Sequence, residues 1–481
     1  MQTPPLLAVL SAGALLRLAV FIYAPALTAN LSSRPESSTP VSSFRSLQEA
    51  VYLQALSAHT ASALTRQSQS IHHSPLLVAS LGRLVGWNNS HSPSTFAHTL
   101  AQAALWSLID TLSAWALYRV SLARSRAKRR RSSTKDQTAQ SSAQPQEAHE
   151  QDAQDGEQAA HQWALRVAAL YLANPFNLVS CWSQSTKPLS SALTLLALQQ
   201  AIEGSAFLST LILSLGAHIS LYPILQIPPL ILLAQHQASA RNENGKSTLA
   251  LLGAISGLLV GLGGGTYAVW LLEGQSWEWV MRTWGSIVFL TDLTPNIGMW
   301  WYFIMEMFDH FRDFFLLVLN AHVLTYVAPF TIKYRDDPLF AFTALAGILA
   351  IFQSYPTVGD SGLFWGLAAL FPELFSYMRY PLVTSLIHIY CAFLLPTFNT
   401  LWLGPGSRSG SGNANFFYAI TLVYSLGGGL GLLDLCYAWG KEKWERERRI
   451  GEKGGGGGGG VALTAAAAVE RAEERRIVVQ M

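Results

Sequence analysis

The amino-acid sequence predicts an all-α fold, a polytopic bundle of membrane-spanning helices. Half of the 481 residues are hydrophobic and only 13% are charged, whereas soluble domains carry about 25% charged residues. The charged residues gather in a few places and leave long apolar runs between them, and 15 Trp, 16 Tyr and 22 Phe accompany these runs. The composition therefore excludes a soluble enzyme and favours a membrane protein.

Cysteine and histidine usage argues against a disulfide framework or a metal centre. The three cysteines are far apart and each lies in an apolar segment, at Cys181, Cys391 and Cys436. Because no CxxC pair is present, we interpret them as small buried hydrophobic residues. His72 and His73 have no carboxylate or further histidine at ligand spacing, and a metal site needs three or four ligands. The net charge of +3 is too small to indicate nucleic-acid binding.

The apolar runs are long enough to cross a membrane, which takes about 20 mostly apolar residues. The run over 5–23 lacks the basic start of a signal peptide and carries Arg17 inside it, so we interpret it as a first span. Further candidates, several of them short or broken by proline, lie near 97–119, 163–183, 188–202, 205–233, 248–272, 280–305, 314–333, 338–354, 361–378, 381–403 and 414–439. We expect about 10–12 spans.

Basic residues predict how the bundle is oriented. They are densest at 119–135, after the second candidate span, and at 441–453, after the last one. The positive-inside rule places both stretches in the cytosol. An even number of spans then puts the N-terminus in the cytosol and the loop 24–95 in the lumen.

The same pattern divides the chain into four parts. Residues 1–131 hold the first two spans and the luminal loop, and 161–440 form the multispan helical core. The insert 132–160 is polar, Gln-rich and almost free of aliphatic residues, so we expect it to be disordered. The tail 441–481 is cytosolic, basic, and rich in glycine and alanine.

The luminal loop contains one predicted helix, over 34–53. Thr39 before Pro40 is typical of a helix start. Apolar residues then recur at helical spacing at Phe44, Leu47, Val51 and Ala55. This amphipathic helix is either a surface anchor or a roof over a cavity between the spans.

The richest polar stretch at membrane depth is 277–313. Residues 292–298 interrupt its helix, because Pro295 pushes Thr294 toward extended geometry and Gly298 permits a sharp turn. Irregular backbone at this depth is tolerated where it faces protein or a wet cavity. The stretch is either an interfacial helix end with an aromatic belt or a site for the head group of an amphiphile. The candidate binding residues here are Asp292, Asn296, Trp301, Phe303, Asp309 and His310.

A second polar cluster opens the last span. Asn413 and Asn415 either cap the helix or hold hydroxyl and phosphate groups, with Phe416 beside them. Two further acidic residues, Asp360 and Asp434, are isolated among apolar residues. We expect each of them to pair internally or to lie near the end of a span.

Catalytic motifs are missing. The luminal loop contains no Asp, and Glu36 and Glu49 are too far apart to imitate a DxD or ExD motif. No GxSxG, HExxH or Walker pattern is present. The residues alone therefore predict no catalytic centre and no cofactor.

Several blocks, taken in order, resemble a known family. They are RPESSTPVSSFRSLQEAVYL, IHHSPLLV, NPFNLVSCWSQST, DLTPNIGMWWYFIMEMFDHFRDFF, FQSYPTVGD and NANFFYAIT. From residue 1 to about 440 the chain resembles the PIG-U family of membrane subunits of GPI transamidase. The insert 132–160 and the Gly/Ala tail depart from the family pattern.

The resemblance implies a multi-pass protein of the endoplasmic reticulum membrane, with a fold like that of lumenal GT-C-type mannosyltransferases. It implies a non-catalytic subunit that binds and presents the GPI lipid, with GPI contacts in 292–312 and 413–416. Catalysis would lie in the Cys–His subunit PIG-K, and further partners would be PIG-T, PIG-S and the GAA-type subunit. The alternative is a lumenal glycosyltransferase that uses a dolichol-phosphate sugar, for which an essential luminal acidic residue would be diagnostic.

Overall fold

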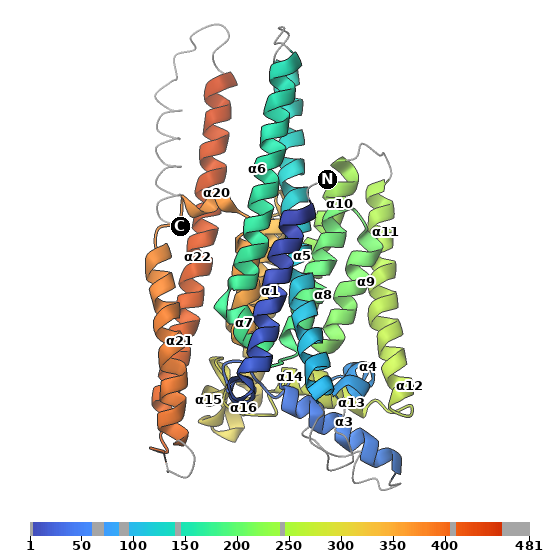
Figure 1. The fold of residues 1–481 in the computed structure, drawn as a ribbon, viewed down its shortest axis with the longest axis vertical. Coiled ribbons are helices and arrows are strands. Elements are labelled where there is room, and N and C mark those ends of the chain that lie inside the picture. Colours follow the sequence, from blue (N-terminus) through green and yellow to red (C-terminus); the bar gives the residue numbers. More distant parts are fainter. Residues whose placement is uncertain are drawn as a thin grey trace.

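The computed structural model describes residues 3–59, 72–85, 96–139, 146–240, 246–404 and 410–454. Within these ranges every regular element is a helix, which confirms the predicted all-α fold (Figure 1). Five helical segments are long and apolar enough to cross a membrane: Pro5–Tyr23, Thr248–Leu272, Asp309–Lys333, Pro381–Leu403 and Asn415–Arg449. The chain is therefore a multi-pass membrane protein.

The helices follow one another along the chain with no strand between them in the described ranges. The first half of the bundle consists of α1 (Thr3–Tyr23), α2 (Pro25–Leu31), α3 (Phe44–His59), α4 (Pro75–Val85), α5 (Phe96–Ala139), α6 (Gln146–Ala173), α7 (Pro175–Trp182), α8 (Lys187–Ile202), α9 (Ala206–Ile219), η2 (Tyr222–Gln226) and α10 (Ile227–Ala240). The second half consists of α11 (Lys246–Leu258), η3 (Leu259–Gly264), α12 (Gly265–Leu272), α13 (Glu278–Val280), η4 (Met281–Gly285), α14 (Ser286–Phe289), α15 (Trp300–Met305), α16 (Asp309–Thr325), α17 (Val327–Lys333), α18 (Pro338–Phe352), α19 (Val358–Ala368), α20 (Pro372–Phe375), α21 (Pro381–Leu403) and α22 (Asn415–Gly454).

The two ends of the bundle differ in chemistry. At one end, called the basic end here, α5, α6 and α22 extend beyond the other helices (Figure 1). There Arg124 and Lys128 pair with Glu373 at 2.7 and 3.3 Å. At the opposite end, called the loop end, α3 and α4 lie near α13–α16 (Figure 1). The loop end is therefore the side that the positive-inside rule assigns away from the cytosol.

Helices extend into the insert for which the composition predicted disorder. Within 132–160, α5 continues to Ala139 and α6 begins at Gln146. Alanine, glutamine and glutamate are strong helix formers, so local propensity favours helix even where no apolar face is present. In the tail, α22 runs to Gly454, and residues 455–481 lie outside the described part of the chain.

Small residues bring α9 against the helix made by α11, η3 and α12. Every fourth residue on that helix is a glycine that faces α9: Gly253, Gly257, Gly261 and Gly265. A Cβ on Gly257 would lie 2.3 Å from the Phe207 carbonyl oxygen. This close approach lets the Thr210 hydroxyl donate to the Ala254 carbonyl at 2.8 Å. The packing is of the small-residue kind that associates helices within a bilayer.

An ion pair joins α1 to α5 inside the bundle. The Arg17 guanidinium contacts the Asp110 carboxylate, with Nη2 2.7 Å and Nε 2.8 Å from Oδ2, and the two side chains are 0% and 1% exposed. Arg17 Nη1 also donates to the Gly13 carbonyl at 3.1 Å. The apolar run 5–23 therefore carries an arginine because an acid on a neighbouring helix neutralises it.

The isolated acids Asp360 and Asp434 pair internally, as the sequence predicted. Asp360 accepts from Lys187 Nζ at 2.8 Å. The Asp434 carboxylate accepts from the backbone N–H groups of Arg379 and Tyr380 at 2.7 and 2.8 Å, just before α21 begins. Both acids therefore stabilise junctions between helices.

Several sequence-based boundaries differ from the structure, and two of them bear on the loop end. Helix α3 begins at Phe44 and not after Thr39, because residues 39–43 form a turn in which Ser42 contacts Thr39 at 2.7 Å and its carbonyl accepts from Thr186 N–H at 3.0 Å. The span predicted over 280–305 is not continuous. It divides into α13, η4 and α14, an irregular segment and α15.

Candidate functional site

The irregular segment 290–299, called the break here, is a structured turn at the loop end. The Asp292 carboxylate accepts from the Thr294 N–H at 2.9 Å. Asn296 is 0% exposed, and its Oδ1 accepts from Gly298 N–H at 2.7 Å while its Nδ2 donates to the Thr294 carbonyl at 3.2 Å. The side chain predicted to contact a ligand at Asn296 thus holds the turn together.

Gly298 is required for a reason other than the sharp turn that the sequence suggested. A Cβ at this position would lie 2.7 Å from Pro356 Cδ and 2.7 Å from Asn296 Oδ1. The left-handed residue of the region is Leu290, with φ of 44°, where α14 ends. Close packing of the break on Pro356 therefore explains the glycine.

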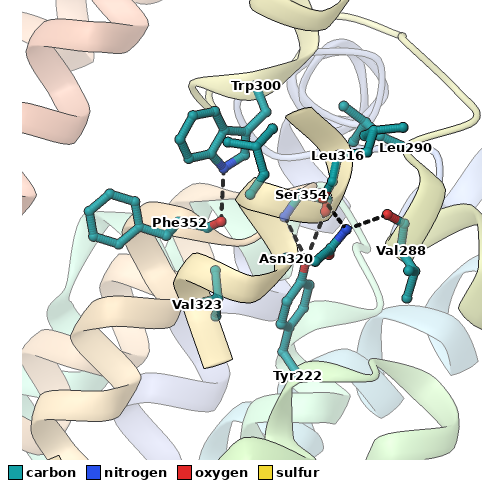
Figure 2. Close-up of a pocket in the computed structure, with 10 residues that line it drawn as sticks. Tyr222, Val288, Leu290, Trp300, Leu316, Asn320, Val323, Phe352 and Ser354 are labelled. Atoms are coloured by element: carbon teal, nitrogen blue, oxygen red, sulfur yellow. Dashed lines mark hydrogen bonds between the residues drawn. The ribbon is translucent and has the colours of Figure 1, made fainter. Parts of the chain in front are cut away.

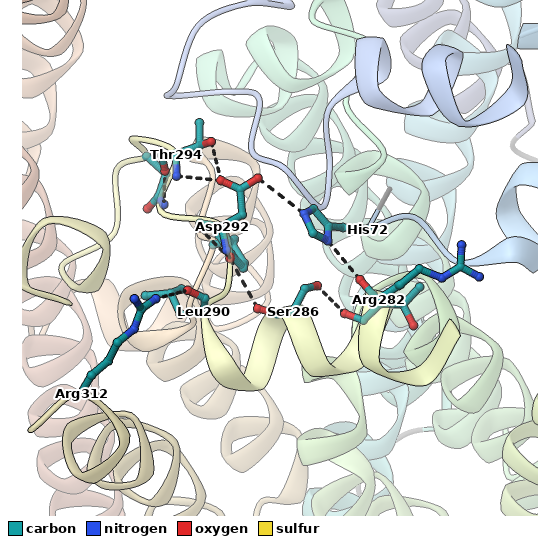
Figure 3. A network of polar contacts seen from close by, with 10 residues as sticks. His72, Arg282, Ser286, Leu290, Asp292, Thr294 and Arg312 are labelled. Atoms are coloured by element: carbon teal, nitrogen blue, oxygen red, sulfur yellow. Dashed lines mark hydrogen bonds and ion pairs between the residues drawn. The ribbon is translucent and has the colours of Figure 1, made fainter. Parts of the chain in front are cut away.

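His72 attaches the first loop to the break (Figure 3). Its Nε2 lies 3.5 Å from Asp292 Oδ2, and its Nδ1 lies 3.0 Å from the Arg282 carbonyl oxygen. Both partners are oxygen acceptors, so the two ring nitrogens link the first loop to Asp292 and to Arg282. Tyr355 provides a second attachment, because its hydroxyl donates to the Asp292 carbonyl at 2.8 Å. Sequence reasoning considered His72 only as a metal ligand, and no local pattern indicates a partner more than 200 residues away.

Because of the contact with His72, the free energy of unfolding should depend on the charge of Asp292, which is lost at low pH. Hydrogen bonding from His72, opposed by partial burial, lowers the pKa of the Asp292 carboxyl to about 2. The charged form of Asp292 is therefore favoured in the folded state. Its contribution to the free energy of unfolding is present above pH 4 and is lost as pH falls toward 2. We expect Asp292→Asn to lower the free energy of unfolding by about 1 kcal/mol near neutral pH, since the group is partly exposed.

Thermal unfolding of the purified protein in detergent measures this effect. The difference between wild type and Asp292→Asn should shrink as pH falls from about 4 to 2, across the range between the ordinary and the lowered pKa. A difference that stays constant over that range would show that the charge of Asp292 does not stabilise the break.

Aromatic packing fixes α15 against the start of α22. Trp301 is 0% exposed and stacks on Trp402 with ring centroids 6.1 Å apart. The Tyr302 hydroxyl donates to Asn415 Oδ1, and the Tyr418 hydroxyl donates to the Met299 carbonyl at 2.9 Å. Trp301, a predicted ligand contact, therefore supports the site from inside, and Tyr302 is a site residue that the sequence prediction missed.

Asn413 caps the start of α22, one of the two alternatives left open by the sequence, whereas the Asn415 side chain contacts Tyr302. Asn413 Oδ1 accepts from the Asn415 N–H at 2.9 Å. Both side chains are nevertheless exposed, and Phe416 beside them is 61% exposed and stacks on Phe398 at 5.9 Å. Asn413 Oδ1 accepts the capping hydrogen bond and Asn415 Oδ1 accepts from the Tyr302 hydroxyl, so the amide N–H groups of both side chains are left for other partners.

The remaining predicted residues lie on the other side of α15. Phe303 is 40% exposed and contacts Phe315 of α16, with ring centroids 5.6 Å apart. Asp309 and His310 open α16, are exposed, and make no hydrogen bond or ion pair with any other residue that the structure describes. Six predicted residues are thus exposed on the two sides of α15, and together they are called the α15 surface here: Asn413, Asn415 and Phe416 on the side of α22, and Phe303, Asp309 and His310 on the side of α16.

The cavity behind α15 is too small for a lipid head group (Figure 2). Its volume is about 10 Å³, enough for about one water. Polar groups around it bond to one another, as when Tyr222 donates to Ser354 Oγ at 2.8 Å and Trp300 Nε1 donates to the Phe352 carbonyl at 2.9 Å. A ligand of this region therefore has to lie on the exposed α15 surface.

A larger, open groove of about 460 Å³ lies between η3, α12 and the segment 277–284. It is lined by Leu221, Ile224, Leu262, Gly263, Thr266, Tyr267, Trp277 and Trp284. With no charged residue in its lining, it suits hydrocarbon and not a charged head.

Comparison with known proteins agrees with this arrangement. Residues 11–424 match the family described as GPI transamidase subunit PIG-U. The chain belongs to the PIG-U family. The resemblance seen in the sequence blocks is thereby confirmed, and the match includes the break and the start of α22.

Individual relatives of the PIG-U family cover different shares of the chain. The chain is 32% identical over 431 residues to GPI transamidase component GAB1 of Saccharomyces cerevisiae. The aligned residues cover 88% of this chain and 91% of that protein. It is 36% identical over 276 residues to GPI-anchor transamidase component PIGU of Homo sapiens, with 57% of this chain and 62% of that protein covered. The GAB1 homolog of Schizosaccharomyces pombe is 39% identical over 147 residues, 31% of this chain and 35% of its own length.

Proposed function

We propose that this PIG-U family chain is a non-catalytic subunit of a GPI transamidase in the endoplasmic reticulum membrane. In this role it binds the complete GPI lipid at the α15 surface and presents it for attachment to precursor proteins. The names of its relatives, GPI transamidase components, support membership of such a complex. The observation that carries lipid binding is the exposed, unpaired Asp309 and His310 beside exposed aromatic rings at the loop end.

Each group on the α15 surface suits one part of a sugar–phosphate–amine head. The Asp309 carboxylate accepts from an ammonium, and His310 approaches phosphate. The amide N–H groups of Asn413 and Asn415 donate to hydroxyl or phosphate oxygens, since their Oδ1 atoms already accept internal hydrogen bonds. Phe303, like Phe416, packs on acyl chains or sugar faces.

Binding of this kind assists the transamidation reaction because it holds the lipid's amine close to the catalytic subunit. The amine of the terminal phosphoethanolamine must reach the acyl-enzyme on the catalytic subunit before water does. Holding both reactants together contributes up to about 7–11 kcal/mol in ideal cases. The partners of the proposal are the catalytic subunit PIG-K together with PIG-T, PIG-S and the GAA-type subunit.

The cysteines of this chain support a non-catalytic role. A cysteine nucleophile needs access to substrate and a histidine base within hydrogen-bond reach. Cys181 and Cys391 are 0% and 1% exposed, and Cys436 is half-buried in α22. The proposal therefore assigns cleavage and transfer to another subunit.

Replacing Asp309 tests lipid binding with little risk to the fold. We expect Asp309→Asn to reduce the GPI lipid that co-purifies with the transamidase complex about fivefold to tenfold, since one charge-assisted contact is worth about 1–1.4 kcal/mol here. Asp313→Asn is the matched control, because Asp313 is also exposed and lies one turn further along α16. Mass spectrometry of extracted lipid, normalised to protein, gives the ratio.

Co-purification of the other subunits must be unchanged in both variants, which separates lipid binding from assembly. Equal GPI recovery in Asp309→Asn, Asp313→Asn and wild type would contradict the proposal. Accumulation of an incomplete GPI intermediate together with loss of the complete lipid, in cells that depend on either variant, would instead favour the glycosyltransferase alternative.

A further inference from the structure

The first loop contains a rigid turn over 34–38 at the loop end. The N–H groups of Ser37 and Ser38 donate to the Arg34 carbonyl at 3.3 and 3.0 Å. The Ser37 hydroxyl donates to the Leu31 carbonyl at 2.6 Å. Val358, the first residue of α19, donates its N–H to the Glu36 carbonyl at 2.9 Å. The backbone that carries Arg34 and Glu36 is therefore held in place from both sides.

Glu36 is buried without any partner for its charge. Its side chain is 7% exposed, and neither carboxylate oxygen has a hydrogen-bond partner in the described part of the chain. Nη1 of Arg34 is also buried and unpartnered among the described residues. A buried ionised group without partners costs several kcal/mol, so such groups are normally paired in the finished structure.

The two side chains are close enough to influence each other but do not pair. Burial raises the pKa of the Glu36 carboxyl, and the residue's own backbone N–H and then the Arg34 charge oppose that rise. The ion pairs found at 4.0 Å or less among the described residues do not include one between them. Within the described part of the chain, Arg34 and Glu36 form no ion pair, and a cation and an anion of this kind on one fixed turn are complementary to a ligand that carries both charges.

We propose that Arg34 and Glu36 form a subsite for a phosphoethanolamine group, in which the guanidinium binds the phosphate and the carboxylate accepts from the ammonium. A planar guanidinium suits phosphate oxygens, and a carboxylate suits the N–H donors of a primary ammonium. In a membrane this group comes from GPI or from phosphatidylethanolamine. The assignment to GPI rests on the proposed function and gives that lipid a second contact point.

The position of the turn fits a ligand that also reaches α15. Val358, which bonds to Glu36, lies in one apolar cluster with Ile297 of the break and Trp301 of α15. Pro356, two residues earlier, packs on Gly298. The subsite and the α15 surface are therefore joined by the same few residues at the loop end.

Charge-removing variants test the subsite in the purified transamidase complex. We expect Glu36→Gln and Arg34→Gln each to lower the recovery of phosphoethanolamine-bearing GPI about tenfold, while GPI species that lack phosphoethanolamine are retained as in wild type. The double variant Arg45→Gln with Glu49→Gln is the matched control, since both residues are exposed and belong to the adjoining helix α3. Lipid mass spectrometry of the same samples measures phosphatidylethanolamine.

The outcomes separate the sources and the two proposals. Loss of phosphatidylethanolamine with GPI unchanged would support the subsite and assign it to the phospholipid. Retention of both lipids in Glu36→Gln and Arg34→Gln would overturn the subsite, while GPI loss in Asp309→Asn would still support the proposed function. If only Asp309→Asn left GPI recovery unchanged, Asp309 would be ruled out as a GPI contact on the α15 surface, and the subsite would stand.

A measurement on the wild-type complex does not depend on whether the variants fold. O-phosphoethanolamine at millimolar concentration should raise the thermal unfolding midpoint, because a ligand that binds only the folded state stabilises it. Phosphocholine, which has no N–H donor for Glu36, should raise it less. Equal shifts with the two compounds, or no shift with either, would overturn the subsite.

Discussion

Replacing Arg17 with leucine is expected to lower the free energy of unfolding by about 3–5 kcal/mol, because it leaves the buried Asp110 carboxylate without its partner. The pair is almost fully excluded from solvent, at 0% and 1% exposure, so water cannot replace the guanidinium. The same change removes the ion pair between α1 and α5, and this ion pair holds the first span against the bundle. Fluorescence-detected size exclusion after a heating series would show the unfolding midpoint fall by many degrees.

The double variant Arg17→Leu with Asp110→Leu is the control for this prediction. Replacing both members of a buried pair with apolar residues is often neutral, so most of the lost stability should return. If the double variant is as unstable as Arg17→Leu alone, shape and packing at this position matter more than charge. If Arg17→Leu has no effect, the ion pair does not contribute to the fold.

Replacing Gly257 with leucine is expected to cost about 3 kcal/mol, since a side chain there must separate α9 from α11. The first carbon alone would lie 2.3 Å from the Phe207 carbonyl oxygen and 2.4 Å from the Thr210 hydroxyl. The separation would also break the hydrogen bond from Thr210 to the Ala254 carbonyl. The expected result is a lower unfolding midpoint and a smaller yield of monodisperse protein.

Gly264→Leu on the same helix is the matched control. No atom lies within 4 Å of the position that its Cβ would take, so the new side chain can extend toward lipid at little cost. Equal losses in Gly257→Leu and Gly264→Leu would indicate that glycine is needed for backbone conformation, and the packing explanation would then be wrong.

Local patterns account for much of this architecture. Apolar runs of span length predicted a helical membrane protein, and Pro295 together with its polar neighbours predicted the break at 292–298. The isolated acids Asp360 and Asp434 were expected to pair internally or to lie near the end of a span, and the structure shows internal pairing. These features follow from hydration, because the bilayer tolerates neither unpaired charge nor unpaired backbone wherever the chain places them.

Pairings between distant residues required the folded chain. No sequence pattern around His72 indicated its contact with Asp292. Asn296 and Trp301 were predicted to contact a ligand, but both side chains are buried in the structure. The unpaired charge of Glu36 is also invisible in the sequence, since burial depends on the approach of α19. The same type of residue can cap a helix, pack in the core or bind a ligand. Which of these it does depends on the neighbours that tertiary packing brings within a few ångströms.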